Sequence, residues 1–143
     1  MKTSLSLLLA VLLGLTAVPA LSMEDDLRER VKLPEPMQHH LLGNMRKHLE
    51  VINSLIALLG SEDFEEAAAL AESELGMSSL EKHGAQHIAQ YYPERMQKFG
   101  TSMHKAASRF ARTAVEGDLP AANRALAEIT QACTNCHAGY RIR

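Results

Sequence analysis

The sequence contains no tryptophan, and aromatic residues make up only 4% of its 143 residues. Its core must therefore be built mainly from aliphatic side chains, and the many alanine, leucine, glutamate and methionine residues favour helices. The chain also lacks an excess of positive charge. Its 15 basic and 17 acidic residues give a formal net charge of −2, unlike the positive net charge of a nucleic-acid-binding protein. Composition and length together predict one small all-α domain.

Cysteine is scarce as well, and both cysteines lie in one run near the C-terminus, Cys133-Thr134-Asn135-Cys136-His137. A structural zinc site usually needs four ligands, and a second Cys-x-x-Cys is missing. A thioredoxin-like redox pair normally opens a helix in a βαβ pattern, whereas these cysteines close a predicted helix. Chance spacing or a disulfide would also account for two cysteines, but a disulfide would leave the adjacent histidine unexplained. The run favours a c-type haem, because its thiols can add to the two porphyrin vinyl groups and its histidine can bind iron.

A long apolar run occurs at the N-terminus, from Leu5 to Val18. A lysine precedes this run and the small residues Ala20 and Ser22 follow it, as in a cleavable secretory signal peptide. The run is shorter than the roughly 20 residues that cross a bilayer. We therefore expect residues 1–22 to be a signal peptide, removed on export to the periplasm, with no membrane span left in the mature chain.

The remaining chain is predicted to contain a lead-in and four helices. Residues 23–34 are charged and lack a clear apolar face, which predicts an extended or frayed segment. Residues 35–143 are expected to form the helical domain, with Ser61 and Asp118 as helix N-caps and residues 77–92 as a connection with about one helical turn. The helices are expected to run from Pro36 to Gly60, from Ser61 to Gly76, from Pro93 to Gly117 and from Asp118 to Tyr140.

Each predicted helix carries apolar residues at spacings of three and four, which indicates a face that packs on a core. In the first helix these residues are Met37, Leu41, Met45, His48 or Leu49, Ile52 and Ile56. In the second they are Phe64, Ala67, Ala68, Ala71 and Leu75. In the third they are Met96, Gly100, Met103, Ala107, Phe110 and Ala114, and in the fourth Ala122, Leu126, Ile129, Cys133, Cys136 and Tyr140. The last stripe leads into both cysteines, so an attached haem would lie between helices.

The four helices, the export signal and the closing Cys133-x-x-Cys136-His137-x-x-Tyr140-Arg141 pattern resemble the class II c-type cytochromes, the cytochrome c′ family. The resemblance covers residues 35–143. It implies an antiparallel four-helix bundle with one haem c, covalently bound through Cys133 and Cys136. It also implies that His137 is the proximal iron ligand, that Arg141 lies near the proximal face, and that the first helix lines the distal face.

Members of that family differ in the residue that faces the iron from the first helix. A methionine sulfur closes the sixth coordination position, whereas an apolar residue leaves it open to small gases. Met37, Leu41, Leu42 and Met45 are available here, and Met45 is the preferred ligand candidate because it lies in the middle of the stripe beside Arg46. Methionine on a core stripe is commonly simple packing, so five- and six-coordinate haem both stay open.

The remaining histidines are not assigned a role. A metal pair or a bis-histidine haem is conceivable, because His83 and His87 have the i, i+4 spacing of a metal pair, but no cysteine or carboxylate completes a site there. Arg46 and Lys47 could pair with haem propionates, although exposed basic residues are more often only solvated. The histidines without an assigned role are His39, His40, His48, His83, His87 and His104.

These patterns predict a periplasmic electron carrier that exchanges electrons with redox partner proteins. A five-coordinate haem protein that binds nitric oxide or carbon monoxide is the alternative. An enzyme such as a peroxidase is not expected, because no distal acid–base group is evident unless His40 or His48 turns inward. The resemblance also implies an antiparallel homodimer through the outer faces of the first two helices.

Overall fold

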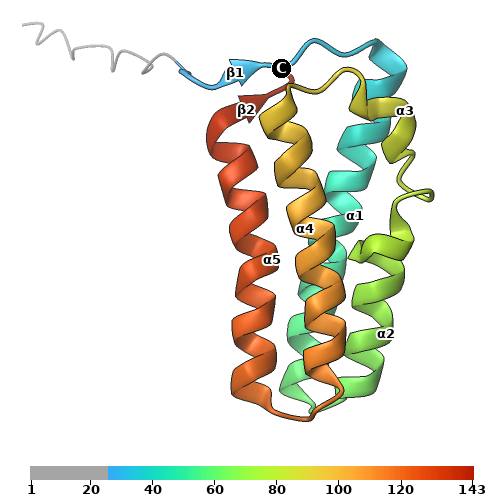
Figure 1. The fold of residues 1–143 in the computed structure, drawn as a ribbon, viewed down its shortest axis with the longest axis vertical. Helices are drawn as coiled ribbons and strands as arrows, with labels where there is room; N and C mark the ends of the chain where they lie inside the picture. Colours follow the sequence, from blue (N-terminus) through green and yellow to red (C-terminus); the bar gives the residue numbers. More distant parts are fainter. Residues whose placement is uncertain (1–25) are drawn as a thin grey trace, which may run out of the picture.

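The computed structural model describes residues 26–143, so the predicted signal peptide lies outside the described residues. This part of the chain is mostly helical, which confirms the all-α prediction, and four long helices lie side by side (Figure 1). Its elements are β1 (Glu29–Arg30), α1 (Glu35–Gly60), α2 (Phe64–Leu75), the 3-10 turn η1 (Met77–Ser79), α3 (Ala85–Ala89), α4 (Glu94–Ala114), α5 (Leu119–Gly139) and β2 (Tyr140–Arg141). None of the helices in residues 26–143 has the length and apolar character needed to cross a membrane.

The helices begin and end close to the residues predicted to limit them, with one exception at Ser61. Asp118 caps α5 as expected, since its Oδ1 accepts a hydrogen bond of 3.0 Å from the Ala121 amide. Ser61 was expected to cap α2, and this is wrong: its amide donates to the Ala57 carbonyl and completes the last turn of α1. Asp63 precedes α2 instead and makes no side-chain cap. The short connection between the two helices leaves Ser61 within the end of α1.

A large apolar core fills the space between α1, α2, α4 and α5. Phe110, Leu55, Leu75 and Ile129 are among its fully buried side chains. The alanines of α2 and α4 allow close approach of the helices, because a methyl side chain keeps neighbouring backbones near each other. The predicted faces of α2, α4 and α5 are confirmed at most positions, but Gly100 is exposed, and Phe64, Cys133, Cys136 and Tyr140 are only partly buried.

The predicted face of α1 is wrong in its second half. Ile56 was expected in the core but is 58% exposed, and of the alternatives His48 and Leu49, His48 is buried whereas Leu49 is 71% exposed. Val51, Leu55 and Leu59 are buried instead and pack with the alanines of α2. Helix α1 carries apolar residues on two faces, so periodicity alone could not choose between them. Contact with the neighbouring helices selects the face.

The lead-in is extended, as predicted, but it is held against the rest of the protein rather than frayed. We call residues 26–33 the strap. Strand β1 pairs in parallel with β2, with Glu29 opposite Tyr140, and the Val31 amide donates to the Arg141 carbonyl at 2.8 Å. Val31 and Leu33 are 3% and 7% exposed, because alternate residues of an extended chain face the same side. The strap therefore covers the end of α5.

The register of α1 can be tested with two matched leucine substitutions. We expect Leu55→Ala to lower the free energy of unfolding by about 2–5 kcal/mol, because it leaves a cavity in the large core. Leu49→Ala on the exposed face should change the free energy of unfolding of the monomer by less than about 0.5 kcal/mol. Urea denaturation followed by circular dichroism measures both. Equal losses of unfolding free energy from the two substitutions would contradict this assignment of the buried face of α1.

Candidate functional site

The Cys133–His137 run forms the last turns of α5, close to β2 and the strap. Both cysteines are partly buried and carry free thiols, so they do not form a disulfide with each other in this structure. Residues three apart on a helix lie on one face, and this face of α5 points toward the interior. The side chain of His137 is exposed. The motif therefore presents two inward thiols beside an accessible imidazole.

The two thiols are in an environment that keeps them protonated. Burial raises the pKa of Cys133 above its ordinary value. Burial also raises the pKa of Cys136, and the nearby Cys133 adds to the effect. Reactive redox cysteines and metal-binding cysteines instead have a lowered pKa, because the thiolate is the active form. The electrostatics of this site therefore argue against a thioredoxin-like pair.

A second apolar cluster surrounds the end of α5, and we call it the small core. Its buried members come from the strap, α1, α3 and α4, and several partly buried residues pack against them. The buried members are Val31, Leu33, Leu41, Ile88 and Met96; the partly buried ones are Met37, Met45, Tyr92, Cys136, Tyr140 and Ile142. The structure thus brings Leu41 and Met45, the predicted distal residues, into the same cluster as Cys136. Cys133 packs against the large core instead.

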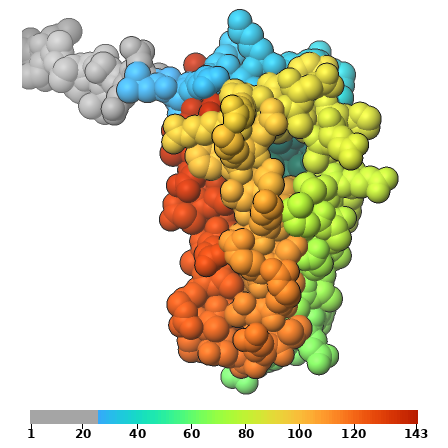
Figure 2. Space-filling view, viewed as in Figure 1, coloured from blue at the N-terminus to red at the C-terminus, as the bar shows by residue number. Residues whose placement is uncertain are grey.

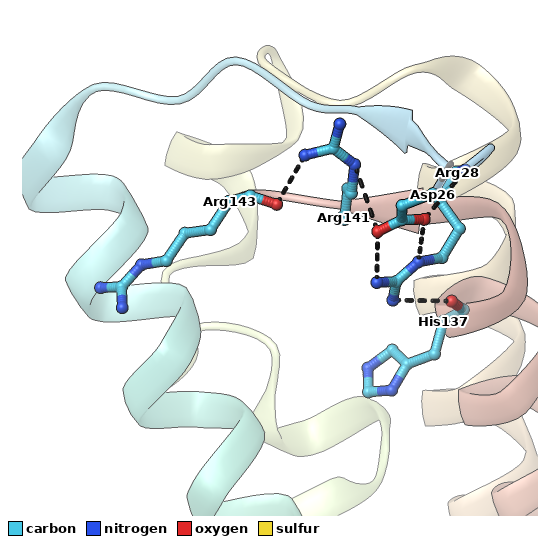
Figure 3. A network of polar contacts seen from close by, with 5 residues as sticks. All are labelled: Asp26, Arg28, His137, Arg141 and Arg143. Carbon is cyan, nitrogen blue, oxygen red and sulfur yellow. Dashed lines mark hydrogen bonds and ion pairs between the residues drawn. The ribbon is translucent and has the colours of Figure 1, made fainter. Parts of the chain in front are cut away.

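A polar network ties the strap to the end of α5 (Figure 3). Arg28 donates from Nε and one terminal nitrogen to the Asp26 carboxylate, each at 2.8 Å. Its other terminal nitrogen donates to the His137 carbonyl at 3.4 Å, where the helix leaves backbone oxygens without partners. Arg141 forms an ion pair of 3.4 Å with Asp26 and donates to the Arg143 carbonyl. The network therefore connects the backbone of the predicted iron ligand to Arg141.

The ionisation of Asp26 and the hydrogen bonding of Arg141 are the two features of this network that bear on the site. The hydrogen bond from Arg28 lowers the pKa of Asp26 to about 2, so its carboxylate stays ionised at any pH near neutrality. The Nε of Arg141 is buried and makes no hydrogen bond, although it lies within ion-pair distance of Asp26. An unsatisfied buried donor of this kind can accommodate an additional acceptor.

Sequence reasoning missed five members of the small core: Val31, Leu33, Ile88, Tyr92 and Ile142. The alternation of Val31, Lys32 and Leu33 was an available signal, because it is the period of an extended strand. Ile88 and Tyr92 lie in a segment whose weak periodicity gave no face. Burial raises the pKa of Tyr92, which is consistent with its position in the cluster.

The histidines divide into two groups. His39, His40 and His87 are exposed, whereas His48, His83 and His104 are buried. His83 and His87 therefore differ in environment and do not form the metal pair that their spacing allowed. Within residues 26–143, no group of three His, Cys, Asp or Glu side chains is arranged to hold a metal ion.

One surface pocket of about 540 Å³ lies beside the motif. Its lining comes from β1, α4 and the last turns of α5, with Glu29, Arg95, Phe99 and Asn135 among the lining residues. The thiols of the motif do not line it. The pocket and the small core share Tyr140, which follows directly after α5.

Comparison of the chain with family models, with curated proteins and with solved structures found no match. The resemblance to class II cytochromes therefore depends on the motif and the helix pattern alone.

Proposed function

We propose that this protein is a c-type cytochrome that carries electrons through one haem c, attached to Cys133 and Cys136, with His137 as the proximal ligand. The observation that carries the proposal is that two free, partly buried thiols lie beside an accessible imidazole at the end of α5, with Cys136 packed against the small core and Cys133 against the large core. The proposal includes the four-helix bundle of that family, built from α1, α2, α4 and α5, and export to the periplasm.

The chemistry of the available side chains fits such a group. Thioether attachment uses two thiols, and both cysteines of the chain are free and partly buried. A porphyrin needs an apolar surface, and the small core contributes Leu41, Ile88 and Met96. The propionates need hydrogen-bond donors, and the Nε of Arg141 is buried and makes no hydrogen bond, although it already forms an ion pair with Asp26. When bound, the haem iron would supply the one-electron change between the ferrous and ferric states.

The residues of this chain would control that change through position and solvent exclusion. Apolar side chains of the small core keep water away from the inward face of α5, and exclusion of water is one of the main influences on a redox potential. Arg28 holds the last turn of α5 through the His137 carbonyl, so the strap would fix the backbone of the proximal ligand. Redox partner proteins would approach the exposed side of His137.

The proposal also includes a homodimer. Leu49 and Ile56 lie on the outward face of α1 and are 71% and 58% exposed. These are the side chains that a contact through the first helices would cover.

Binding of nitric oxide or carbon monoxide is the second candidate function, and one observation favours it. Leu41 is buried in the small core, whereas Met45 is only partly buried at its edge. An apolar residue over the iron would leave the sixth position open. The identity of the distal residue therefore decides between an electron carrier and a gas-binding protein.

Attachment can be tested on the two cysteines. We expect that Cys133→Ala or Cys136→Ala weakens covalent attachment and that the double variant loses it, because each thiol would form one thioether bond. The chain should be produced together with c-type cytochrome maturation proteins, and acid–acetone extraction measures the haem that stays bound. His87→Ala, at an exposed histidine, is the control. Haem retained by the double variant would refute covalent attachment.

The distal ligand can be tested with matched methionine substitutions. If the Met45 sulfur binds iron, the ferric protein will be low-spin, and Met45→Leu will make it high-spin and able to bind carbon monoxide. Met103→Leu, in the large core, should leave the spectrum unchanged. Both changes nearly conserve volume and should cost less than about 1.5 kcal/mol of stability. A high-spin wild-type protein that Met45→Leu does not alter would exclude methionine ligation and favour gas binding.

A further inference from the structure

Three buried histidines from separate parts of the chain meet away from the cysteine motif. His48 comes from α1, His104 from α4, and His83 from the turn between η1 and α3. Their ring centroids are 4.8 Å apart for His48 and His83, 5.4 Å for His83 and His104, and 6.3 Å for His48 and His104. Each residue is at most 9% exposed. We call these three residues the histidine cluster.

The hydrogen bonds around the histidine cluster are those expected of uncharged imidazole rings. The Nδ1 of His104 donates to the Leu75 carbonyl at 2.8 Å, so its Nε2 needs no proton. The Ser79 hydroxyl donates its proton to the Gly76 carbonyl at 2.7 Å. It can therefore only accept hydrogen bonds from the neighbouring rings, whose Nδ1 atoms lie 3.5 Å away in His83 and 3.4 Å away in His104. The Nε2 of His48 is buried without any partner.

Few charges are available to stabilise protonated rings. Glu74 of α2 is the carboxylate that acts on His48 and His83, and it is already paired with Lys82. Lys82 and His40 act on His83 with the opposite sign, and Lys47 of α1 acts on Glu74. Burial, and then the other two rings, lowers the pKa of His48 to about 4. Burial also lowers the pKa of His83 and His104, so all three are neutral at pH 7.

The cluster lies where residues 77–92 are fastened to α1 and α4. The His83 carbonyl accepts hydrogen bonds from His40 Nε2 at 2.8 Å and from the Asn44 side chain at 3.2 Å. The Met77 amide donates to the Ser108 hydroxyl at 2.9 Å. A hollow between α4 and the chain around residues 77–84, with α1 at its floor, opens toward this region (Figure 2). The same segment continues to Ile88 and Tyr92 of the small core.

We infer that His48, His83 and His104 form an acid-sensitive latch, whose protonation releases residues 77–92 from α1 and α4 and thereby opens the small core. Three imidazolium rings at these separations repel one another in a buried site with one shared carboxylate. The inference does not require a bound haem, because the latch and the segment that it holds consist of this chain alone.

The direction of the pH effect follows from the lowered pKa of the closed state. A histidine of this kind stabilises the closed state fully above its ordinary value of 6.5, and this stability is lost as the pH falls toward about 4. For His48 alone, the ratio of closed to open protein should fall roughly 30-fold between about pH 7.5 and about pH 5. His83 and His104 change the ratio in the same direction.

Hydrogen exchange of the full chain tests the latch at these two pH values, after correction for intrinsic exchange rates. We expect the protection of the Ala85, Ile88 and Tyr92 amides to fall at least tenfold at the lower pH, while amides near Ile129 in α5 keep theirs. His48→Leu removes the ring without a hydrogen-bond partner and should reduce the fall. His87→Leu, at an exposed histidine, should leave it unchanged.

Titration of the histidine ring protons by nuclear magnetic resonance gives an independent readout if His48→Leu does not fold. The latch requires that the rings of His48, His83 and His104 titrate below the ordinary histidine pKa of about 6.5. Protection of residues 77–92 that does not depend on pH would overturn the inference. So would a full fall in His48→Leu, an equal fall in α5, or ordinary titration of all three rings.

Discussion

Apolar contact around the end of α5 is the interaction on which the site depends. The small core joins the strap, α1, α3 and α4 to Cys136. Helix α1 packs mainly on α2, so this cluster is what brings Leu41 and Met45 close to the motif. Backbone pairing of β1 with β2 holds the strap in place so that Val31 and Leu33 can be buried there. The large core orders the helices, but the small core determines what surrounds the end of the motif.

The limits of the helices could be predicted from the sequence, because the residues that start and end a helix act on the backbone next to them. Proline and aspartate at helix starts and glycine near helix ends placed the limits of α1, α4 and α5 within a few residues. The face of α1 could not be chosen in the same way, since Leu49 and Leu55 both fit a helical period and only the neighbouring helices separate them. The contacts of the strap and of α3 were missed for a related reason. Their order comes from contacts with residues distant in sequence.

In the candidate site, too, the local motif could be predicted, whereas contacts between residues distant in sequence were missed. The run from Cys133 to His137 is visible in the sequence. The structure places Leu41 and Met45 in one cluster with Cys136, and their role as distal residues stays a prediction. The histidine cluster could not be predicted, because His48, His83 and His104 come from three segments and share no spacing. The two cores also differ in character: alanine packs the large core tightly, whereas Met37, Met45 and Met96 give the small core adaptable surfaces.

The central claim is that this chain holds one covalent haem, and the mass of the intact, denatured protein tests it most directly. The chain should be produced with c-type cytochrome maturation proteins and separated from free haem before the measurement. We predict a mass equal to the polypeptide plus one haem, with the added mass located on a peptide that contains Cys133 and Cys136. A mass equal to the polypeptide alone, or to the polypeptide with a disulfide between the two cysteines, would contradict the claim.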